Sequence, residues 1–229
     1  MSAWSGRIWI GRDWWCFEGV SGDSRPHAHL CAQIVGALHG TARVETEAGV
    51  VDAPAIAIPA GARHRLLGAE GGLRAIYPRP LGRLARRWRI AGEVAARPDL
   101  TGLLTGGDLT VTLEAEAALG ETQPIDSRLR RVLDALDGDL SISDLAHRAG
   151  LSTARLRALA QAELGAPLAH WRLWRRLELA VLRVRAGAPL AAAAVEAGFA
   201  DQSHLNRTMS RFFGITPRTV ARLLDPLPK

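Results

Sequence analysis

The sequence of 229 residues has few cysteines, a single lysine at Lys229 and no long apolar run. Cys16 and Cys31 are too few for a disulfide scaffold, which favours a reducing compartment. No apolar stretch reaches the roughly 20 residues that cross a membrane. The first residues, MSAWSGRIWIGRDWW, lack the basic and then apolar order of a signal peptide. These absences argue against a disulfide-rich secreted domain and a membrane protein, and they predict a cytoplasmic location.

The composition that remains is ordinary for a globular protein, with 48% hydrophobic and 23% charged residues. The length is sufficient for two domains. Residues 1–125 hold 13 arginines and 13 acidic residues, whereas residues 126–229 hold 16 basic and 10 acidic ones, so the net charge of +6 belongs to the second part. A basic part beside a neutral one is typical of a module that contacts phosphate, joined to a module that does not.

The most informative segment is LAAAAVEAGFADQSHLNRTMSRFFGITP at 190–217. Ala194 precedes Gly198 by four residues, a spacing in which a small residue lets two helices cross closely and a glycine accepts the positive φ of the turn. Asp201 can then cap a second helix, which would bury Leu205 and Met209. The opposite face of this helix carries side chains that suit base edges and phosphates, namely Gln202, Ser203, Asn206 and Arg207.

A second copy of this pattern lies 48 residues upstream, measured from Gly150 to Gly198. Ala146 again precedes the glycine by four residues, and Ser152 can cap a helix that buries Leu156. Residues 167–186 between the copies indicate one helix of roughly 28 to 30 Å at ~1.5 Å per residue. That length is close to the ~34 Å between successive major-groove faces of B-DNA. One chain could therefore read two groove segments side by side.

The helix predicted at 167–186 has an apolar stripe at helical spacing, which we interpret as the core that joins both units to one rigid rod. This stripe consists of Leu168, Trp171, Trp174, Leu177, Val181 and Val184. Arg172, Arg175 and Arg176 fall beside the stripe, and we expect them to contact phosphate or to lie at the surface.

The order of these features resembles the AraC/XylS transcription regulators, whose C-terminal domain holds two helix-turn-helix units joined by a long helix. The resemblance covers residues 126–222 and includes the run GFADQSHLNRTMSRFFGITP. It implies a sequence-specific transcription regulator rather than an enzyme, with a double-stranded DNA operator and RNA polymerase as partners and with activation favoured over repression. On the first reading helix it implies four base-facing positions, namely Thr153, Ala154, Arg157 and Ala158.

Residues 1–80 contain short apolar runs at 7–10, 14–17, 42–47, 55–58 and 74–77, separated by turn residues. Such spacing predicts a small barrel or sandwich. If residues 27–33 form a strand, alternate side chains share one face, and these are His27, His29, Cys31 and Gln33. The segment PAGARH leads His64 into another strand. The pattern H-x-H-x3-Q with a later P-x-G-x2-H resembles the two cupin motifs, which implies that His27, His29, Gln33 and His64 line a pocket.

Four interpretations of this pocket stay open. By resemblance to metal cupins it would bind a divalent transition metal of the nickel, zinc or cobalt class, although Gln33 replaces the usual Glu and Cys31 could add a soft ligand. It could instead hold a small effector without any metal, or the histidines could be structural. Catalysis by a cupin-bound metal is a fourth alternative, disfavoured because the sequence places no further acid or base near the pocket.

Together these features predict an α+β protein of two domains. A cupin-like β-barrel at 1–80 is followed by an all-α DNA-binding domain with two helix-turn-helix units at 126–229. Residues 81–125 connect them, and the resemblance implies that this segment supplies helices for a homodimer. Occupancy of the pocket is expected to shift the population of molecules that can bind DNA.

Overall fold

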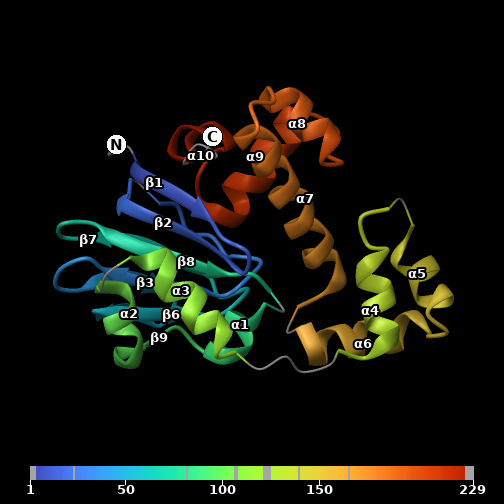
Figure 1. The fold of residues 1–229 in the computed structure, drawn as a ribbon, viewed down its shortest axis with the longest axis horizontal. Helices are drawn as coiled ribbons and strands as arrows, with labels where there is room; N and C mark the ends of the chain where they lie inside the picture. Colours follow the sequence, from blue (N-terminus) through green and yellow to red (C-terminus); the bar gives the residue numbers. More distant parts are fainter. Residues whose placement is uncertain are drawn as a thin grey trace.

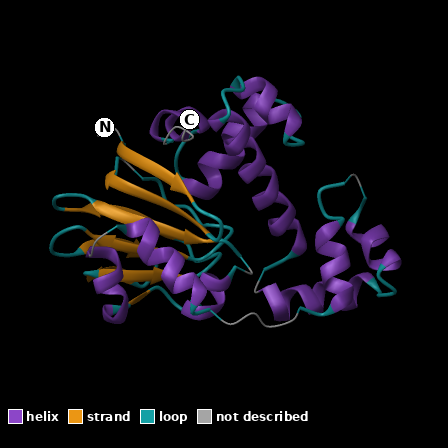
Figure 2. Cartoon of the chain, in the orientation of Figure 1, coloured by secondary structure: helices purple, strands orange, loops and turns teal. Residues whose placement is uncertain are grey.

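The computed structural model describes residues 4–22, 24–80, 82–105, 108–120, 125–138, 140–164 and 166–224. A strand-rich N-terminal part is followed by a helical C-terminal part (Figures 1 and 2). Several residues of the predicted connecting segment, at 81, 106–107 and 121–124, lie outside the described residues. Across the ranges given above, none of the helices has the length and apolar character needed to cross a membrane.

Two antiparallel sheets form the N-terminal part. One has the strand order β1-β2-β8-β3-β6-β9 and the other the order β5-β4-β7. The strands are β1 Ser5–Ile10, β2 Trp14–Val20, β3 Gln33–Ala37, β4 Ala42–Thr46, β5 Gly49–Ala53, β6 Ala55–Ile58, β7 His64–Ala69, β8 Leu73–Pro78 and β9 Ala95–Ala96. The five runs predicted as strands are thus confirmed as β1, β2, β4, β6 and β8.

The predicted barrel is present in a coarser form, as two sheets whose inner faces share one apolar core. Among the described residues the ladders do not close into one continuous barrel. An isolated antiparallel bridge between His27 and His64 ties the segment before β3 to β7. The prediction of a strand over 27–33 is wrong, because β3 begins only at Gln33. Bends at Leu30 and Cys31 interrupt the extended backbone between this bridge and β3.

Three short helices cover the other face of the six-stranded sheet (Figure 1). They are α1 Arg83–Trp88, α2 Thr101–Thr105 and α3 Leu109–Ala118, with the 3-10 turn η1 Pro98–Leu100 before α2. The period of two along β2 explains this layer. Trp14 and Cys16 pack against the helices, whereas Trp15 and Phe17 enter the core on the opposite face. Both faces of β2 are therefore buried, which accounts for its continuous apolar run.

The helical part contains two helix-turn-helix units joined by one long helix (Figure 1). Ser141 caps the first helix of the first unit in a capping box with Asp144, and Asp201 caps the second helix of the second unit. The helices are α4 Ser127–Asp134, α5 Ile142–Arg148, α6 Thr153–Leu164, α7 Leu168–Arg185, α8 Leu190–Glu196, α9 Gln202–Phe213 and α10 Pro217–Leu223.

The turns of the two units have the same hydrogen bonds, as the repeated sequence pattern predicts. Gly150 and Gly198 have φ values of 69° and 79°. The residue after each glycine donates its amide to the small residue four positions before that glycine, Leu151 to Ala146 and Phe199 to Ala194, each at 2.9 Å. Both alanines are buried, which lets α5 and α6, and α8 and α9, pack closely.

The predicted apolar stripe of α7 is buried except for Val184, which is half-buried, and its two ends enter different cores. Leu168 and Trp171 pack with α4–α6. Trp174 and Val181 pack with α8–α10 and also with residues of the sheets, including Trp15. The helix therefore joins the first unit to a larger body that contains the second unit and the N-terminal part.

Arg172 and Arg175 are half-buried and bind backbone carbonyls in and after the last turn of α4, contacts that the expected phosphate or surface role did not include. Arg172 donates to the carbonyl oxygens of Leu136 at 3.0 Å and Leu140 at 2.6 Å, and Arg175 donates to that of Leu133 at 2.7 Å. The last carbonyls of a helix have no partner within the helix. The two guanidinium groups satisfy such carbonyls and fix the first unit to α7.

Candidate functional site

The second reading helix, α9, presents its predicted polar face to solvent. Gln202, Ser203 and Arg207 are exposed, and Asn206 is half-buried. On the opposite side Leu205 and Met209 are buried, with 1% and 2% of their surface exposed. This division between faces is what a helix needs in order to enter a DNA groove while it stays attached to its own domain.

The first reading helix, α6, has a similar but less polar face. Ala154, Arg157 and Ala158 are exposed and Thr153 is half-buried, whereas Leu156 is fully buried. Neither Arg157 nor Arg207 of α9 forms a salt bridge with any other described residue. Both guanidinium groups are therefore available to a phosphate or a base edge.

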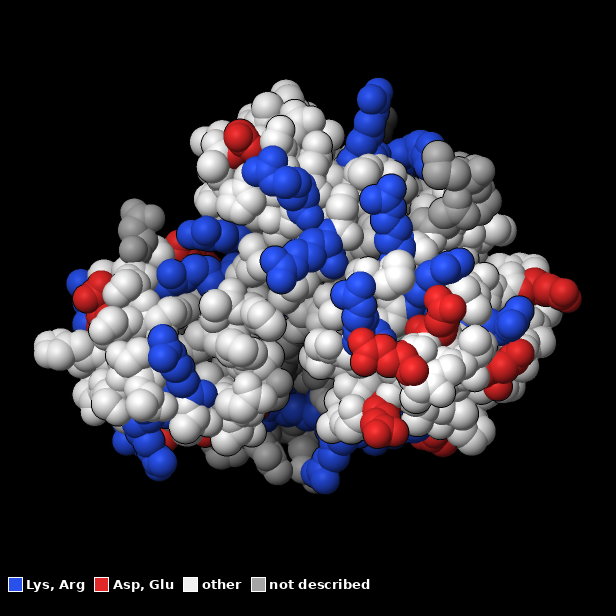
Figure 3. All heavy atoms as spheres, turned by 180° about the vertical axis from the view of Figure 1, so that it is seen from behind, with Lys and Arg blue, Asp and Glu red and all other residues white. Residues whose placement is uncertain are grey.

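Basic side chains dominate much of the face shown in Figure 3. Arginines follow the helical units at the left and top of this view, and acidic side chains mix with them mainly over the sheet-bearing part at the right. This arrangement agrees with the excess of basic residues in the C-terminal half of the sequence. The helical part can therefore attract a polyanion by its charge alone.

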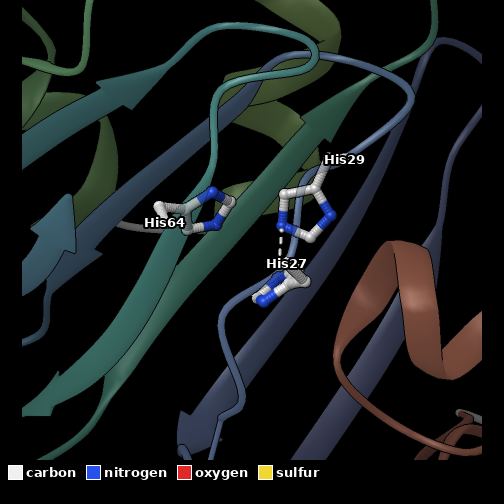
Figure 4. Close-up of side chains that lie close together, drawn as sticks. All are labelled: His27, His29 and His64. Carbon is white, nitrogen blue, oxygen red and sulfur yellow. Dashed lines mark hydrogen bonds between the residues drawn. The ribbon is translucent and has the colours of Figure 1, made fainter. Parts of the chain in front are cut away.

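The predicted pocket contains three buried histidines whose rings converge (Figure 4). His27 comes from the loop before β3, His29 from the same loop, and His64 from the first position of β7. The Nε2 atoms of His27 and His29 are 3.1 Å apart. One potential ligand atom from each of the three side chains lies within 4.8 Å of the others.

Each imidazole is oriented by a backbone carbonyl at its Nδ1 atom. The acceptors are the carbonyl oxygens of Arg25 for His27 at 2.7 Å, Phe212 for His29 at 2.6 Å and Ala62 for His64 at 2.9 Å. Because a carbonyl can only accept, Nδ1 must carry the hydrogen, and in a neutral ring Nε2 then carries the lone pair. Neither neutral ring then has a hydrogen for the 3.1 Å contact between the Nε2 atoms of His27 and His29 (dashed in Figure 4), which brings two lone pairs together. This orientation by a second partner is the usual arrangement around histidines that bind metals.

Burial disfavours the charged form of all three rings. It lowers the pKa of His27, and it lowers the pKa of His64 to about 4. The pKa of His29 is held well below its usual range by burial and, to a smaller extent, by the neighbouring imidazoles. At neutral pH the cluster therefore consists of uncharged rings, the form that binds a cation.

Gln33 lies beside the histidines, whereas Cys31 is not part of the group. Gln33 donates from Nε2 to the hydroxyl of Tyr77 at 2.9 Å, and its buried Oε1 has no hydrogen-bond partner among the described residues. Cys31 packs in the apolar core, and burial raises the pKa of its thiol. The structure thus brings together His27, His29 and His64 with Gln33 next to them, and it leaves Cys31 as a neutral thiol.

Sequence reasoning missed the wall of this site that the C-terminal end of α9 supplies. Phe212 accepts the hydrogen bond of His29, and the ring of Phe213 lies 5.6 Å from the His29 ring between centroids. Gly214 is so close to His27 that an added Cβ would be 3.2 Å from its ring. These contacts join residues more than 180 positions apart, and no local pattern could have indicated them.

The histidine site belongs to a broad interface between the sheets and the second helix-turn-helix unit. Trp15 of β2 packs on Trp174 of α7 with ring centroids 5.4 Å apart. Arg79, after β8, forms an ion pair with Glu178 of α7. A cavity of about 40 Å³ in this interface is lined by apolar side chains from both sides, among them Trp15, Phe17, Val181, Met209 and Phe213. A larger hollow of about 860 Å³ lies elsewhere and contains none of the predicted site residues.

Known proteins resemble this chain in its helical domain and in its overall fold. Residues 145–222 match a family of helix-turn-helix domains of the AraC type. No curated protein matches the sequence. A structure of ToxT from Vibrio cholerae strain SCE256 with an unsaturated fatty acid bound is 8% identical, with a TM-score of 0.62 over 96% of this chain and 98% of that one. A second structure of ToxT from Vibrio cholerae is 9% identical, with a TM-score of 0.61 over 93% and 99% of the two chains. At such low identity the likeness to ToxT shows a shared fold.

Proposed function

We propose that the chain is a transcription regulator of the AraC/XylS family that reads a specific double-stranded DNA site with both units, because residues 145–222 match a family of helix-turn-helix domains. The observation that supports this most directly is the exposure of the polar faces of α6 and α9 on either side of one rigid helix. α7 has 18 residues and a length of about 27 Å. This length suits two helices that enter successive major-groove segments.

The proposed contacts divide by chemistry. Arg207 and Arg157 would each form two hydrogen bonds with a guanine, and Gln202 and Asn206 would bind adenine edges. Ser203 and Thr153 would contact a phosphate or a base. Small apolar contacts, for example to a thymine methyl group, remain for Ala154 and Ala158. On this assignment α9 reads more bases than α6 does.

The test is the affinity for DNA that the full chain selects from a random duplex library. Arg207→Ala and Arg157→Ala should each weaken binding to the selected site by about 1 to 3 kcal/mol, measured by fluorescence anisotropy. Arg65→Ala is the matched control, because Arg65 lies on β7 and pairs with Glu45 of the sheet. Unchanged affinity of both reading-helix variants would refute the assigned roles.

We further propose that the N-terminal part is a cupin-like sensor domain whose effector is a divalent transition metal of the nickel, zinc or cobalt class. Three neutral imidazoles with oriented Nε2 atoms are a suitable donor set for such an ion. His27, His29 and His64 would hold it, and Oε1 of Gln33 is a buried acceptor available beside them. The ion would supply a positive charge that fixes the orientation of all three rings.

Elemental analysis and thermal shift test this assignment. The wild type should bind about one ion per chain, and the double variant His27→Ala/His64→Ala should lose it together with the metal-dependent rise in melting temperature. Binding that persists in the double variant, or no binding by the wild type, would remove the metal from the proposal.

An apolar effector is the second candidate, because a structure of similar fold, ToxT, holds an unsaturated fatty acid. The apolar cavity between the sheets and α9 offers about 40 Å³, far below the roughly 300 Å³ at which pockets for small molecules begin. A fatty acid would therefore have to separate the two surfaces. A titration with oleate that shifts the melting temperature of the His27→Ala/His64→Ala variant would favour this candidate.

Activation of transcription, recruitment of RNA polymerase and homodimer formation are further parts of the proposal that rest on the family. Sedimentation of the full chain with and without its selected DNA tests the dimer. Run-off transcription from a promoter that carries the selected site tests the sign of regulation.

A further inference from the structure

The C-terminal turn of α9 completes the histidine site, although this helix belongs to the DNA-reading domain. Phe212, the penultimate residue of α9, accepts the Nδ1 hydrogen of His29 at 2.6 Å. Phe213 stacks at an angle on the same histidine, and a Cβ added at Gly214 would lie 3.2 Å from the His27 ring. Three consecutive residues of the DNA reader therefore form one side of the proposed effector site.

The hydrogen bond between His29 and Phe212 couples the two sides through one imidazole ring. A cation on Nε2 withdraws electron density and makes Nδ1–H a stronger donor, and a carbonyl at Nδ1 makes Nε2 a better ligand. Each interaction therefore strengthens the other. The coupling is reciprocal: the free energy by which the bound ion stabilises the docking of α9 equals the free energy by which docking strengthens ion binding.

We infer that a metal ion at His27, His29 and His64 holds the C-terminal end of α9 against the sheets through the His29–Phe212 hydrogen bond, so that the metal controls how firmly the second reading unit is docked. This inference rests on the proposed metal site. It goes beyond that site because it names the element that responds and the contact that transmits the response. Without metal, the second reading unit is held against the sheets by the rest of the interface. This includes the Trp15–Trp174 contact and the Arg79–Glu178 ion pair.

Hydrogen exchange of the full chain with and without Co²⁺ tests the response. Peptides that cover 209–215 should exchange several-fold more slowly when the ion is bound, because the amide of Gly214 is held by Ser210 only while the last turn of α9 is intact. Peptides of α5 and α6 are the internal control and should not change, since the core of the first unit contains no residue of the histidine site. Equal exchange at 209–215 in both states would overturn the inference.

The reciprocal measurement uses variants that leave all three histidines in place. Glu178→Gln removes the ion pair with Arg79, and Phe213→Ala removes the ring that packs on His29. A variant whose amides at 209–215 exchange faster than in the wild type has weaker docking of α9. Its affinity for Co²⁺, measured by the absorption of the bound ion, should fall by up to about 10- to 100-fold. Asp99→Asn is the control, because Asp99 pairs with Arg97 within the N-terminal part.

The two proposals fail differently. If the wild type binds no Co²⁺, the metal site itself is wrong. If Co²⁺ binds and is lost from His27→Ala/His64→Ala, but its affinity is the same in a variant with faster exchange at 209–215, the site stands and the coupling is refuted.

Discussion

At the residue scale, the two turn glycines offer a matched comparison. Gly150 and Gly198 both have positive φ, so alanine at either position should cost about 1 to 2 kcal/mol of unfolding free energy. At Gly198 an added Cβ would also lie 3.1 Å from Nε of Arg176, whereas nothing lies within 4 Å at Gly150. Urea unfolding should therefore show a larger loss for Gly198→Ala than for Gly150→Ala. Two equal or negligible losses would contradict this account of the turns.

The buried histidines make a prediction for the metal-free protein in acid. His64 has a pKa of about 4 in the fold against 6.5 ordinarily. Between these values the unfolded chain binds more protons than the folded one, so stability falls as the pH falls through this window. From neutral pH to pH 4 the loss attributable to His64 should be roughly 2 to 3 kcal/mol. Urea unfolding in a chelator should show a flatter pH dependence for His64→Gln, and an unchanged slope would refute the assignment.

Single residues were predictable where one local rule decides their position. Asp201 and Ser152 cap helices as predicted, because each side chain accepts a hydrogen bond from a free amide in the first turn. Cys31 was placed with the histidines by assuming a strand over 27–33. That assumption failed because β3 starts at Gln33, so the period of two does not apply to the residues before it.

At the scale of elements, the first unit depends on two arginines of α7. Arg172→Met should lower the stability of this unit by about 1 to 3 kcal/mol, because it leaves the carbonyls of Leu136 and Leu140 without their charged donor. Arg183→Met is the control, since the Arg183–Glu196 pair is largely exposed and such pairs contribute about 0 to 1 kcal/mol. Thermal unfolding followed by circular dichroism compares them, and an equal effect would show that the carbonyl contacts add little.

The helices were predicted more completely than the sheets for a physical reason. A helix is defined by caps and spacing within a few residues, and the second unit shows both in its sequence. The pairing of β3 with β6 and β8 and the cover of α1–α3 depend on contacts between distant residues. The carbonyl partners of Arg172 and Arg175 were missed for the same reason, because they lie in and after the last turn of α4, 32 to 42 positions away.

At the scale of the whole molecule, the chain forms two cooperative bodies that do not follow the boundary between the sheets and the helices. The second helix-turn-helix unit shares its core with the sheets, whereas the first unit has a core of its own. Native-state hydrogen exchange should therefore show α8–α10 opening together with β1 and β2, and α4–α6 opening separately with a lower free energy. Simultaneous opening of the two helix-turn-helix units, with the sheets intact, would contradict this division.

This sharing of a core was the largest feature that the sequence did not predict. The apolar stripe of α7 predicted a buried helix, but an apolar stripe does not identify the elements that pack against it. The stripe predicted Trp174 as a core residue, and only the structure shows that it packs on Trp15 of β2. The three histidines and the C-terminal end of α9 therefore touch, a contact that no local pattern in the sequence indicated.

The central claim is that one rigid chain reads DNA with α6 and α9 at the same time. Footprinting on the duplex selected by the wild type tests this directly, because each reading helix should protect one major-groove segment, and the two segments should be about one helical turn apart. Arg157→Ala should weaken protection of one segment and Arg207→Ala that of the other. Protection of a single segment that both substitutions affect equally, or no preferred sequence at all, would contradict the account.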